Sequence, residues 1–253
     1  MNIQEKSYVY GLLGTDGSLY LQDRNRGRIT LEVNIKDKDI IEKLYNIIPQ
    51  SSIVTRTRDT NFKDKYESIS FINYQLDFRT ELINFGYPIA DKTNTISIPK
   101  QDYSERDFWR GVIDGDGSIG ITASNEPFIS LVTKSEKLKQ YYCKMLFDNF
   151  NIVKVISRNK RDDIYNIVVK NEDAIKLAEF LYKDSSIYLE RKYQKYLEVI
   201  NWERTKKKIS RQIWTEKEIE FIKNHTIKES ATELNRTESS IRNKKYRVMK
   251  GGN

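Results

Sequence analysis

Hydrophobic and polar residues alternate along several stretches of the chain, most clearly over residues 28–35. Ile29, Leu31, Val33 and Ile35 are apolar, and the residues between them are polar. A period of two predicts a strand with one buried face. The following stretches predict a helix, two more strands and a second helix, at residues 36–48, 52–58, 66–72 and 76–86. Gly86 fits a helix C-cap.

The same succession of elements occurs twice. Residues 8–21 (YVYGLLGTDGSLYL) match residues 108–121 (FWRGVIDGDGSIGI) without a gap, at an offset of 100 residues. After the second copy, the pattern predicts strands at 118–124, 128–133, 152–158 and 164–170, and helices at 135–150, 172–182 and 189–202. A repeat of this length indicates a duplicated half-domain. We therefore expect an α+β fold with two pseudo-symmetric αββαββα halves and antiparallel sheets.

Breaks in the pattern predict the domain boundaries. The first half spans residues 1–90, a linker follows at 91–104, and the second half spans 105–202. Residues 203–212 are basic and lack periodicity, which is typical of a linker. Residues 213–253 contain three short helical segments, with Thr215 and Thr237 as N-caps. Their short connections predict a helix-turn-helix module.

Composition excludes several kinds of site. The chain has one cysteine, Cys143, and one histidine, His225, so it forms neither an internal disulfide nor a structural zinc site, and a bound metal needs oxygen ligands. Cys143 lies in an apolar stretch and is expected in the core. We find no apolar run of membrane-spanning length and no signal-peptide pattern, and we expect a soluble, intracellular protein without a membrane partner. The net charge is +8, and residues 201–253 hold 14 basic and 7 acidic residues, which indicates a polyanionic partner.

The repeated motif places small residues four apart before an acidic residue. Gly11 and Thr15 share one helix face, and Gly111 and Gly115 share the other, so the two helices are expected to pack closely. This packing would bring Asp16 and Asp116 together.

Two carboxylates at adjacent helix C-termini repel each other and the helix dipoles. A divalent cation offsets this repulsion, and oxygen ligands favour Mg²⁺, with Mn²⁺ as a substitute. Such a site can hydrolyse phosphodiesters. We also expect Gly17 and Gly117 to adopt positive φ. An Asp-Gly pair alone also fits a simple turn, but two copies in matched contexts favour a metal site.

The motif residues Val9–Gly17 (VYGLLGTDG) and Trp109–Gly117 (WRGVIDGDG) resemble those of the LAGLIDADG homing endonucleases of the single-chain, two-motif class. The resemblance extends over about residues 5–202. It implies two saddle-shaped sheets over a long DNA site, cleavage of both strands with magnesium, and metal ligation by Asp16 and Asp116.

The two motifs differ at their sixth position, which is acidic in the family. It is Asp114 in the second copy and Gly14 in the first, so Asp114 is expected to support a ligand or to cap a helix. The resemblance also implies a catalytic lysine at the end of a strand, where Lys170 lies. The matching place near Asn73 has none, so the two centres should differ. Lys134 is a further candidate for a DNA contact. Both lysines also fit solvated strand ends.

The polar strand faces are expected to bind DNA. Arginine and glutamine suit contacts to guanine and adenine, although any exposed sheet shows polar alternation. The candidates are Gln22, Arg24, Arg26, Arg28, Thr30, Asn34, Arg56, Arg58, Ser118, Thr122, Ser130, Lys134, Lys154, Arg158 and Asn166.

The C-terminal segment, which begins at Trp214, resembles a Myb/SANT-like helix-turn-helix module. Its third helix offers Arg242, Asn243, Lys244 and Arg247 to DNA, and a basic solvated helix is the alternative interpretation.

The sequence therefore predicts a site-specific double-strand DNA endonuclease of the homing type. We expect a monomer, without a protein partner, that binds a long, pseudo-symmetric duplex target. The alternative is an RNA-splicing maturase or a non-cleaving DNA-binding regulator of the same fold. Retention of both aspartates favours the enzyme, because a pure binding protein has no need of two repelling carboxylates.

Overall fold

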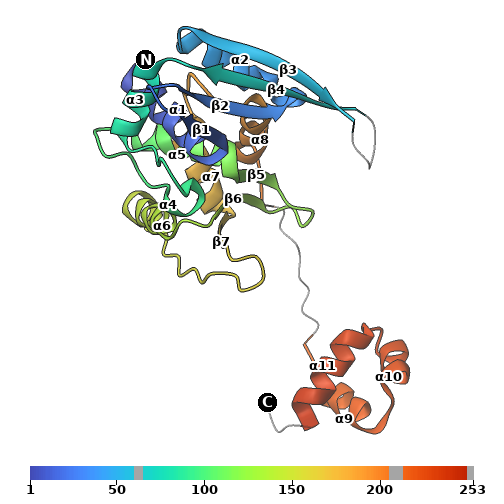
Figure 1. Ribbon diagram of the computed structural model, residues 1–253. Coiled ribbons are helices and arrows are strands. Elements are labelled where there is room, and N and C mark those ends of the chain that lie inside the picture. The colour runs from blue at the N-terminus through green and yellow to red at the C-terminus, as the bar shows by residue number, and fades with distance from the viewer. Residues whose placement is uncertain (60–64, 205–212, 250–253) are drawn as a thin grey trace. The chain divides into compact units, whose positions relative to one another are not determined.

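The structure, a computed structural model, describes residues 1–59, 65–204 and 213–249. The chain divides into two compact units, Met1–Arg204 and Thr205–Asn253 (Figure 1). The predicted basic linker at 203–212 lies outside the described residues from position 205 onward. Over the described ranges, no helix has the length and apolar character that crossing a bilayer requires.

The first half contains a four-stranded antiparallel sheet in the order β1-β2-β4-β3. Its elements are α1 (Ile3–Asp16), β1 (Gly17–Leu21), β2 (Gly27–Asn34), a 3-10 turn η1 (Ile35–Asp37), α2 (Lys38–Ile47), β3 (Ser51–Arg58), β4 (Tyr66–Asn73) and α3 (Leu76–Phe85). Ile29 and Leu31 on β2 are fully buried, as the alternation predicts. Gly86 ends α3 in the left-handed region with φ of 118°, so the predicted C-cap is confirmed.

The second half repeats this arrangement with a three-stranded antiparallel sheet, β5-β6-β7. A short helix, α4 (Lys92–Thr95), lies in the predicted linker. The other elements are α5 (Glu105–Asp116), β5 (Gly117–Ile121), β6 (Pro127–Thr133), α6 (Glu136–Phe150), β7 (Tyr165–Lys170), α7 (Glu172–Tyr182) and α8 (Glu190–Ile200). The predicted α+β class is confirmed.

The strand predicted at 152–158 is wrong. Within the described residues, β-pairing near this stretch is limited to an isolated bridge between Asn159 and Ile164. The Lys154 Nζ donates to the Val168 carbonyl (2.7 Å), so a side chain contacts the edge of β7. Val153 and Val155 are 71% and 92% exposed. Alternation marks two faces of a segment, but it does not supply a backbone partner.

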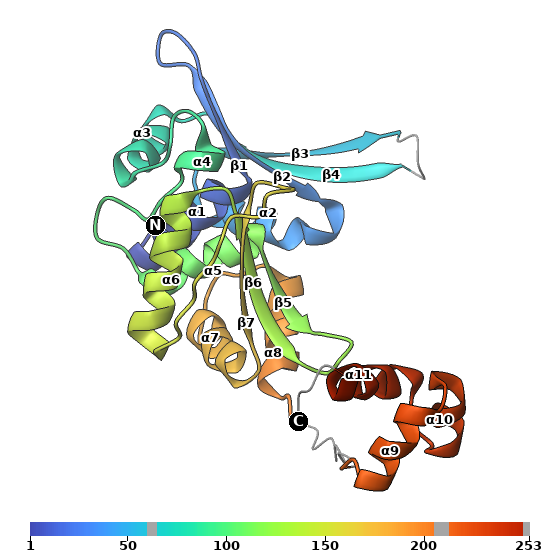
Figure 2. The same cartoon turned by 90° about the horizontal axis from the view of Figure 1, so that it is seen from below.

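Helices α1 and α5 lie side by side between the two sheets (Figures 1 and 2). A Cβ atom on Gly11 would lie 2.3 Å from the Phe108 carbonyl oxygen, and one on Gly111 would lie 2.2 Å from the Tyr8 carbonyl oxygen. These reciprocal contacts leave no room for a side chain at either glycine. Backbone therefore packs directly on backbone where the helices cross.

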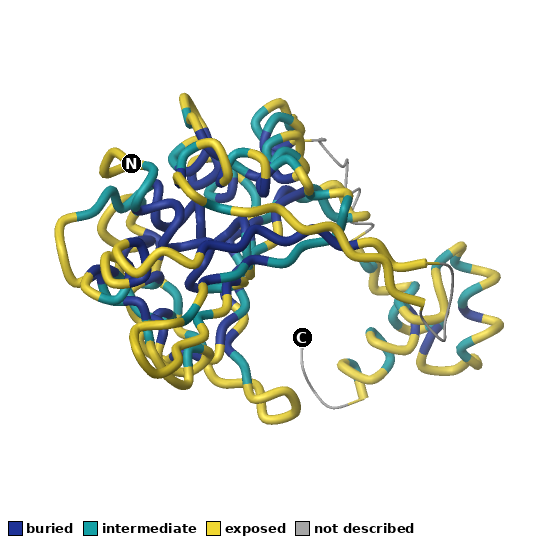
Figure 3. The backbone as a smooth tube through the Cα atoms, turned by 45° about the horizontal axis from the view of Figure 1, so that its top comes forward, coloured by how far each residue is buried: buried dark blue, intermediate teal, exposed yellow. Residues whose placement is uncertain are grey.

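The hydrophobic core surrounds this helix pair. Figure 3 shows buried segments in the interior and exposed segments around them. Buried residues run along α1 and α5, whereas β3 is largely exposed. Trp109 on α5 is one of the largest fully buried side chains and packs on Phe108 and Tyr142, with ring centroids 4.8 and 4.9 Å away. Cys143 is half-buried and packs against the same core. The core thus fixes the two motif helices more firmly than the outer strands.

The C-terminal unit contains α9 (Glu216–Asn224), α10 (Ile227–Glu233) and α11 (Glu238–Met249), where helical spacing predicts them. Its small core includes Ile222 and Ile241, which are both fully buried. Thr215 caps α9 and Thr226 caps α10, each in a reciprocal capping box with a glutamate. Capping thus stabilises helices too short to form alone.

Candidate active site

Asp16 and Asp116 are the last residues of α1 and α5, and β1 and β5 begin directly after them. Because the helices cross at Gly11 and Gly111, their C-terminal ends remain adjacent. A Cβ atom on Gly115 would lie 1.9 Å from Thr15 Oγ1 and 3.3 Å from Asp16 Oδ2. The structure thus brings the two aspartates together, and each side chain reaches solvent although protein surrounds much of its carboxylate.

Gly17 and Gly117 do not adopt the positive φ that we expected. Their φ angles are −73° and −96°, in the extended region, because each begins a strand rather than a left-handed turn. Their need for glycine is steric instead. A Cβ atom on Gly17 would lie 2.5 Å from the Leu13 carbonyl oxygen, and one on Gly117 would lie 2.7 Å from that of Ile113.

Two lysines lie beneath the aspartates: Lys192 is buried and Lys92 is half-buried. Lys92 Nζ donates to the carbonyl oxygens of Thr15 and Gly17, at the end of α1. Lys192 Nζ does the same at the end of α5, where it donates to the carbonyls of Ile113, Asp114, Gly115 and Gly117 at 2.6–3.2 Å. Each lysine therefore places a cation at the negative end of a motif helix.

These charges set the ionisation of the pair. The pKa of Asp116 is raised to about 6, first by burial and then by the nearby Asp16, while Lys92 and Lys192 lower it. Burial also raises the pKa of Asp16, and Lys192 followed by Lys92 opposes this shift. Burial lowers the pKa of Lys192 to about 8. The site therefore holds two carboxylates that repel each other above two lysines that partly compensate.

Sequence reasoning missed both lysines. Lys92 lies in the predicted linker at 91–104, and Lys192 lies in the helix predicted at 189–202, to which no function was assigned. A signal was nevertheless present, because the two positions are 100 residues apart, the same offset as the two aspartates. Applying the repeat offset to charged residues outside the motif gives a short list of like-charged pairs that includes these two lysines.

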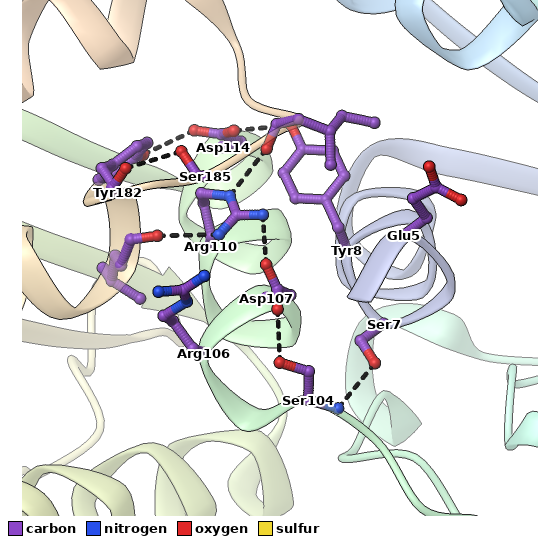
Figure 4. A network of polar contacts seen from close by, with 12 residues as sticks. Glu5, Ser7, Tyr8, Ser104, Arg106, Asp107, Arg110, Asp114, Tyr182 and Ser185 are labelled. Atoms are coloured by element: carbon purple, nitrogen blue, oxygen red, sulfur yellow. Dashed lines mark hydrogen bonds and ion pairs between the residues drawn. The ribbon is translucent and has the colours of Figure 1, made fainter. Parts of the chain in front are cut away.

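Asp114 anchors the helix that carries Lys192 (Figure 4). Its carboxylate accepts hydrogen bonds from the hydroxyls of Tyr8 (2.7 Å) and Tyr182 (2.6 Å) and from the backbone NH of Leu189 (2.8 Å). Leu189 is the N-cap of α8. Burial raises the pKa of Asp114, and the nearby Lys192 and these hydrogen bonds oppose that shift.

The first half also holds the start of α8. Asp39 accepts a hydrogen bond from the Glu190 backbone NH (2.9 Å), and Asp37 pairs with Arg191 at 3.0 Å. Acidic groups at a helix N-terminus interact favourably with its dipole. Lys192 is therefore positioned from both halves.

A buried network around Arg110 connects α5 to the segment before α8 (Figure 4). The Arg110 guanidinium donates to the carbonyls of Leu181 (2.9 Å) and Ile187 (2.8 Å) and pairs with Asp107 at 2.5 Å. Asp107 in turn accepts a hydrogen bond from Ser104. A buried charge costs stability unless it is paired in this way, and this network holds the motif helix against its surroundings.

Lys170 lies away from the two aspartates. It is exposed at the end of β7, pairs in register with Phe128 and lies 3.7 Å from a Glu126 carboxylate oxygen. Gly117, next to Asp116, is instead opposite Leu131, three positions along β6. Lys134, directly after β6, is exposed. The structure brings Lys92 and Lys192, rather than Lys170, to the acidic pair.

The DNA-binding candidates of the first half occupy one sheet face and the adjoining hairpin. Arg28, Thr30 and Asn34 lie on the polar face of β2, and Arg56 and Arg58 lie on the same face of β3. The hairpin between β1 and β2 contains Gln22, Arg24 and Arg26. Asn34 also accepts a hydrogen bond from the Lys36 backbone NH, so it caps the following 3-10 turn.

The candidates of the second half are more scattered. Ser118 and Ser130 are directly opposite each other on β5 and β6, and Asn166 is exposed on β7. Thr122 accepts a hydrogen bond within the β5–β6 hairpin. Lys154 contacts the edge of β7, and Arg158 pairs with Asp163 at 2.8 Å.

The oxygen ligands of the site fit a magnesium ion. Over the described ranges, no group of three or more histidine, cysteine or acidic side chains is placed to hold a metal. The site thus offers a metal ion two carboxylates, those of Asp16 and Asp116. Magnesium is commonly bound by one or two carboxylates, with waters and substrate phosphates completing its octahedron. A zinc site would need more protein ligands than these.

Comparisons with known proteins bear on the fold. Residues 104–182 match the LAGLIDADG-like domain family. A search of curated protein sequences found no match. The solved structure titled "The homing endonuclease I-WcaI bound to its DNA recognition sequence" is similar with a TM-score of 0.58 and 17% sequence identity, over 76% of this chain and 86% of that chain.

Two further solved structures align with lower scores. The LAGLIDADG meganuclease I-AabMI, bound to uncleaved DNA, aligns over 79% of this chain and 89% of its own, with 14% identity and a TM-score of 0.48. Full-length DUF199/WhiA from Thermatoga maritima aligns over 98% and 90%, with 14% identity and a TM-score of 0.45. The family match and the similarity to I-WcaI show that the chain contains a LAGLIDADG-like domain and has the fold found in homing endonucleases.

Proposed function

We propose that this protein is a site-specific DNA endonuclease that uses a divalent metal ion, Mg²⁺ or in its place Mn²⁺. The observation that carries the proposal is the duplicated helix pair, which ends in Asp16 and Asp116 above Lys92 and Lys192. Two adjacent carboxylates, one of which raises the pKa of the other, are costly in a site without a cation. A metal-dependent role accounts for the arrangement better than a structural one.

The residues of the site divide the work. Asp16 and Asp116 would hold Mg²⁺, which supplies Lewis-acid activation of water and stabilisation of phosphate oxygens. Lys92 and Lys192 hold the helix C-termini through carbonyl hydrogen bonds, and their charges favour the ionised aspartates. Asp114 positions Lys192 through α8. Lys170, farther along the sheet, is available to a DNA phosphate.

The two sheets would bind the DNA duplex. Their polar faces carry the candidate residues described above, and the hairpin arginines extend the surface beyond the sheet. Support comes from the fold shared with I-WcaI, a homing endonuclease whose structure was determined on its DNA recognition sequence. A monomer with two similar but unequal halves fits a long, pseudo-symmetric target.

The decisive experiment compares binding and cleavage by the purified full-length chain. Cleaved sites are first selected from a random duplex library with Mg²⁺. Asp16→Asn and Asp116→Asn should retain binding to the selected site and lose cleavage by at least about a hundredfold. Asp77→Asn, a matched charge change in the first turn of α3, should cut normally. Full cleavage by both site variants would overturn the mechanism.

The same experiment separates the alternatives. A wild-type chain that enriches a duplex site and never cuts it with Mg²⁺ or Mn²⁺ is a DNA-binding regulator. A chain that prefers a folded intron RNA over every duplex is a maturase. Either result would overturn the proposed nuclease, because both aspartates would then lack a role in cleavage.

The C-terminal unit is proposed as a second DNA-binding module. On α11, Ser239, Arg242, Asn243 and Tyr246 are exposed at helical spacing, so they form one stripe. Lys244 is half-buried, and Arg247 is exposed beside the stripe. A helix with such a stripe suits the major groove, with arginines on phosphates and Asn243 on a base edge.

This module has its own test. The double variant Arg242→Gln, Arg247→Gln should weaken DNA binding and reduce the salt slope by about 0.9 for each lost phosphate contact. Lys217→Gln on α9 is the matched control and should change neither. An unchanged slope in the double variant would assign α11 to a solvated surface.

A further inference from the structure

A carboxylate lies in the middle of the polar face of the first sheet, where arginines predominate. Glu32 on β2 accepts a hydrogen bond from Ser68 Oγ (2.7 Å) and from Arg58 Nη2 (3.0 Å), and its other oxygen lies 3.7 Å from Arg56 Nη1. Its side chain is 30% exposed, whereas those of Arg56 and Arg58 are 50% and 55% exposed. The three charged groups therefore form one accessible cluster.

The strand order explains how these residues meet. Because β4 lies between β2 and β3, the two arginines extend across Ser68 to reach Glu32. Arg56 and Arg58 are two positions apart on β3, which separates them by about 6.6 Å along the strand. That spacing is close to two base-pair steps of about 3.4 Å each. The two arginines are thus spaced like base pairs that lie two steps apart.

The surroundings of Glu32 also indicate a ligand. The hydroxyls of Thr30 and Ser70 are buried and have no hydrogen-bond partner within the described residues. Ser70 is directly opposite Glu32 in the sheet register. Thr30 and Glu32 line a hollow of about 420 Å³ that also borders Asp16. Unpaired buried hydroxyls are unfavourable, and Thr30, which lines the hollow, would gain a partner from a polar group that enters there.

The chemistry of the cluster matches one base pair in the major groove. Guanine presents the O6 and N7 acceptors, which suit an arginine, and its partner cytosine presents an N4 amino donor, which suits a carboxylate. Thymine presents the O4 acceptor in the groove, and this oxygen would repel Glu32. A carboxylate beside an arginine can therefore both favour a G·C pair and exclude a thymine.

We propose that Glu32 is a specificity-determining residue that, together with Arg56 and Arg58, selects a G·C base pair in the half-site bound by the first sheet. Glu32 accepts from cytosine N4 and positions the arginine that binds guanine. The inference rests on the proposed function, since it needs the polar sheet face to lie in the major groove.

The second sheet lacks this cluster. At the repeat offset of 100 residues, Val132 stands in place of Glu32 and Ile156 in place of Arg56. The selection should therefore affect one half-site only, which gives the experiment an internal reference in every bound DNA.

The test is a binding selection from a random duplex library, run without metal on full-length protein. The wild type should enrich a site with a fixed G·C pair in one half-site. Glu32→Gln should reduce the preference at that position by about tenfold, within the range of one good base contact. Other positions should be unchanged, because glutamine keeps the size of the side chain but tolerates an acceptor. Arg58→Gln should affect the same pair or its neighbour.

The matched control is Glu67→Gln. Glu67 lies on β4 of the same sheet but on the opposite face, so its loss changes the charge equally without touching the cluster. It should raise affinity slightly for all sites and leave every base preference intact. Equal thermal unfolding midpoints for both variants exclude a folding defect as the cause.

Two results would overturn the proposal. If the wild type selects a site and Glu32→Gln selects it with the same preferences at every position, Glu32 plays no part in reading bases. If the wild type enriches no duplex sequence, the proposed function fails and this inference fails with it.

Discussion

The two halves end their motif helices alike but support them differently. Lys192 belongs to an 11-residue helix whose start is held by Asp114 and by Asp39 from the other half. Lys92 belongs to a four-residue helix. Yet both lysines reach the equivalent carbonyl oxygens beside their aspartates. The duplicated chemistry has been kept while the framework around it has diverged.

The difference is clearest at the sixth motif position. In the second half, the buried Asp114 connects three elements through hydrogen bonds. In the first half, Gly14 leaves room for Ile96, whose Cδ1 would lie 2.7 Å from a Cβ atom there. A polar anchor in one half thus corresponds to an apolar contact in the other. The acid at this position therefore holds the start of α8, the helix that carries Lys192.

The largest expected effect is on the rate of DNA cleavage when Lys92 or Lys192 is replaced, and it shows whether the two lysines have the same role. Lys192 has the stronger influence on the pKa of Asp16, and Lys92 on that of Asp116. Lys92→Met and Lys192→Met should each slow cleavage on the order of a hundredfold, with opposite strands affected most. Duplexes labelled on one strand at a time measure this. Equal loss on both strands in both variants would show that the halves act as one unit.

The next largest effect is on the free energy of unfolding when the sixth motif residue, Asp114 or Gly14, is replaced. Asp114→Ala leaves two tyrosine hydroxyls and a backbone NH without their acceptor, and should lower the free energy of unfolding by about 3 kcal/mol. Gly14→Ala meets only the tip of a flexible isoleucine and should cost about 1 kcal/mol. Urea unfolding measures both changes. A Gly14→Ala variant as unstable as Asp114→Ala would contradict the comparison.

A smaller effect concerns pH. Because the pKa of Asp116 is raised to about 6, its carboxyl is protonated at a higher pH than an ordinary aspartate. Protons should compete with Mg²⁺, so metal affinity should fall by up to about tenfold per pH unit below pH 6. Titration calorimetry at several pH values measures this dependence.

Asp16→Asn provides the reference for the pH experiment. Without the charge of Asp16, the pKa of Asp116 should fall, and the residual metal binding should lose affinity only at lower pH. The linked effect on stability has the opposite sign. In metal-free protein, ionising this carboxyl reduces stability as pH rises from about 4 to 6, so Asp116→Asn should remove that decline. A pH profile unmoved in Asp16→Asn would contradict the coupling.

The smallest effect distinguishes the outer strands. Amides of β3 pair with β4, whereas residues 152–158 lack such pairing apart from the adjoining bridge at Asn159. Hydrogen exchange in DNA-free protein should therefore be several-fold faster at 153–158 than in β3, since the Ile152 amide donates to Leu146. The Asn159 amide, which donates to Ile164, is the protected control. Equal protection of both stretches would show that residues 153–158 form a paired strand, as their alternation predicts.

The local pattern of apolar residues and the repeat offset were enough to predict most of the elements and the pairing of the two aspartates. The period of two identified the buried face of β2, and the helical spacing located the helices. The repeat aligned Asp16 with Asp116, and the small residues at Gly11 and Gly111 indicated the helix contact that brings the aspartates together. These features depend on nearby residues or on exact repetition, so the sequence alone reveals them.

Only the tertiary structure decided which distant groups serve the site. Lys92 and Lys192 were hidden because their role depends on chain segments folding back beneath the helix ends. In the sequence, Glu32 is one polar residue among several on its strand. Only the strand order places it beside Arg56 and Arg58. The stretch 152–158 alternates like a strand, yet pairing requires a neighbour that periodicity does not supply. All three features depend on contacts between residues far apart in the sequence, and no local pattern encodes such contacts.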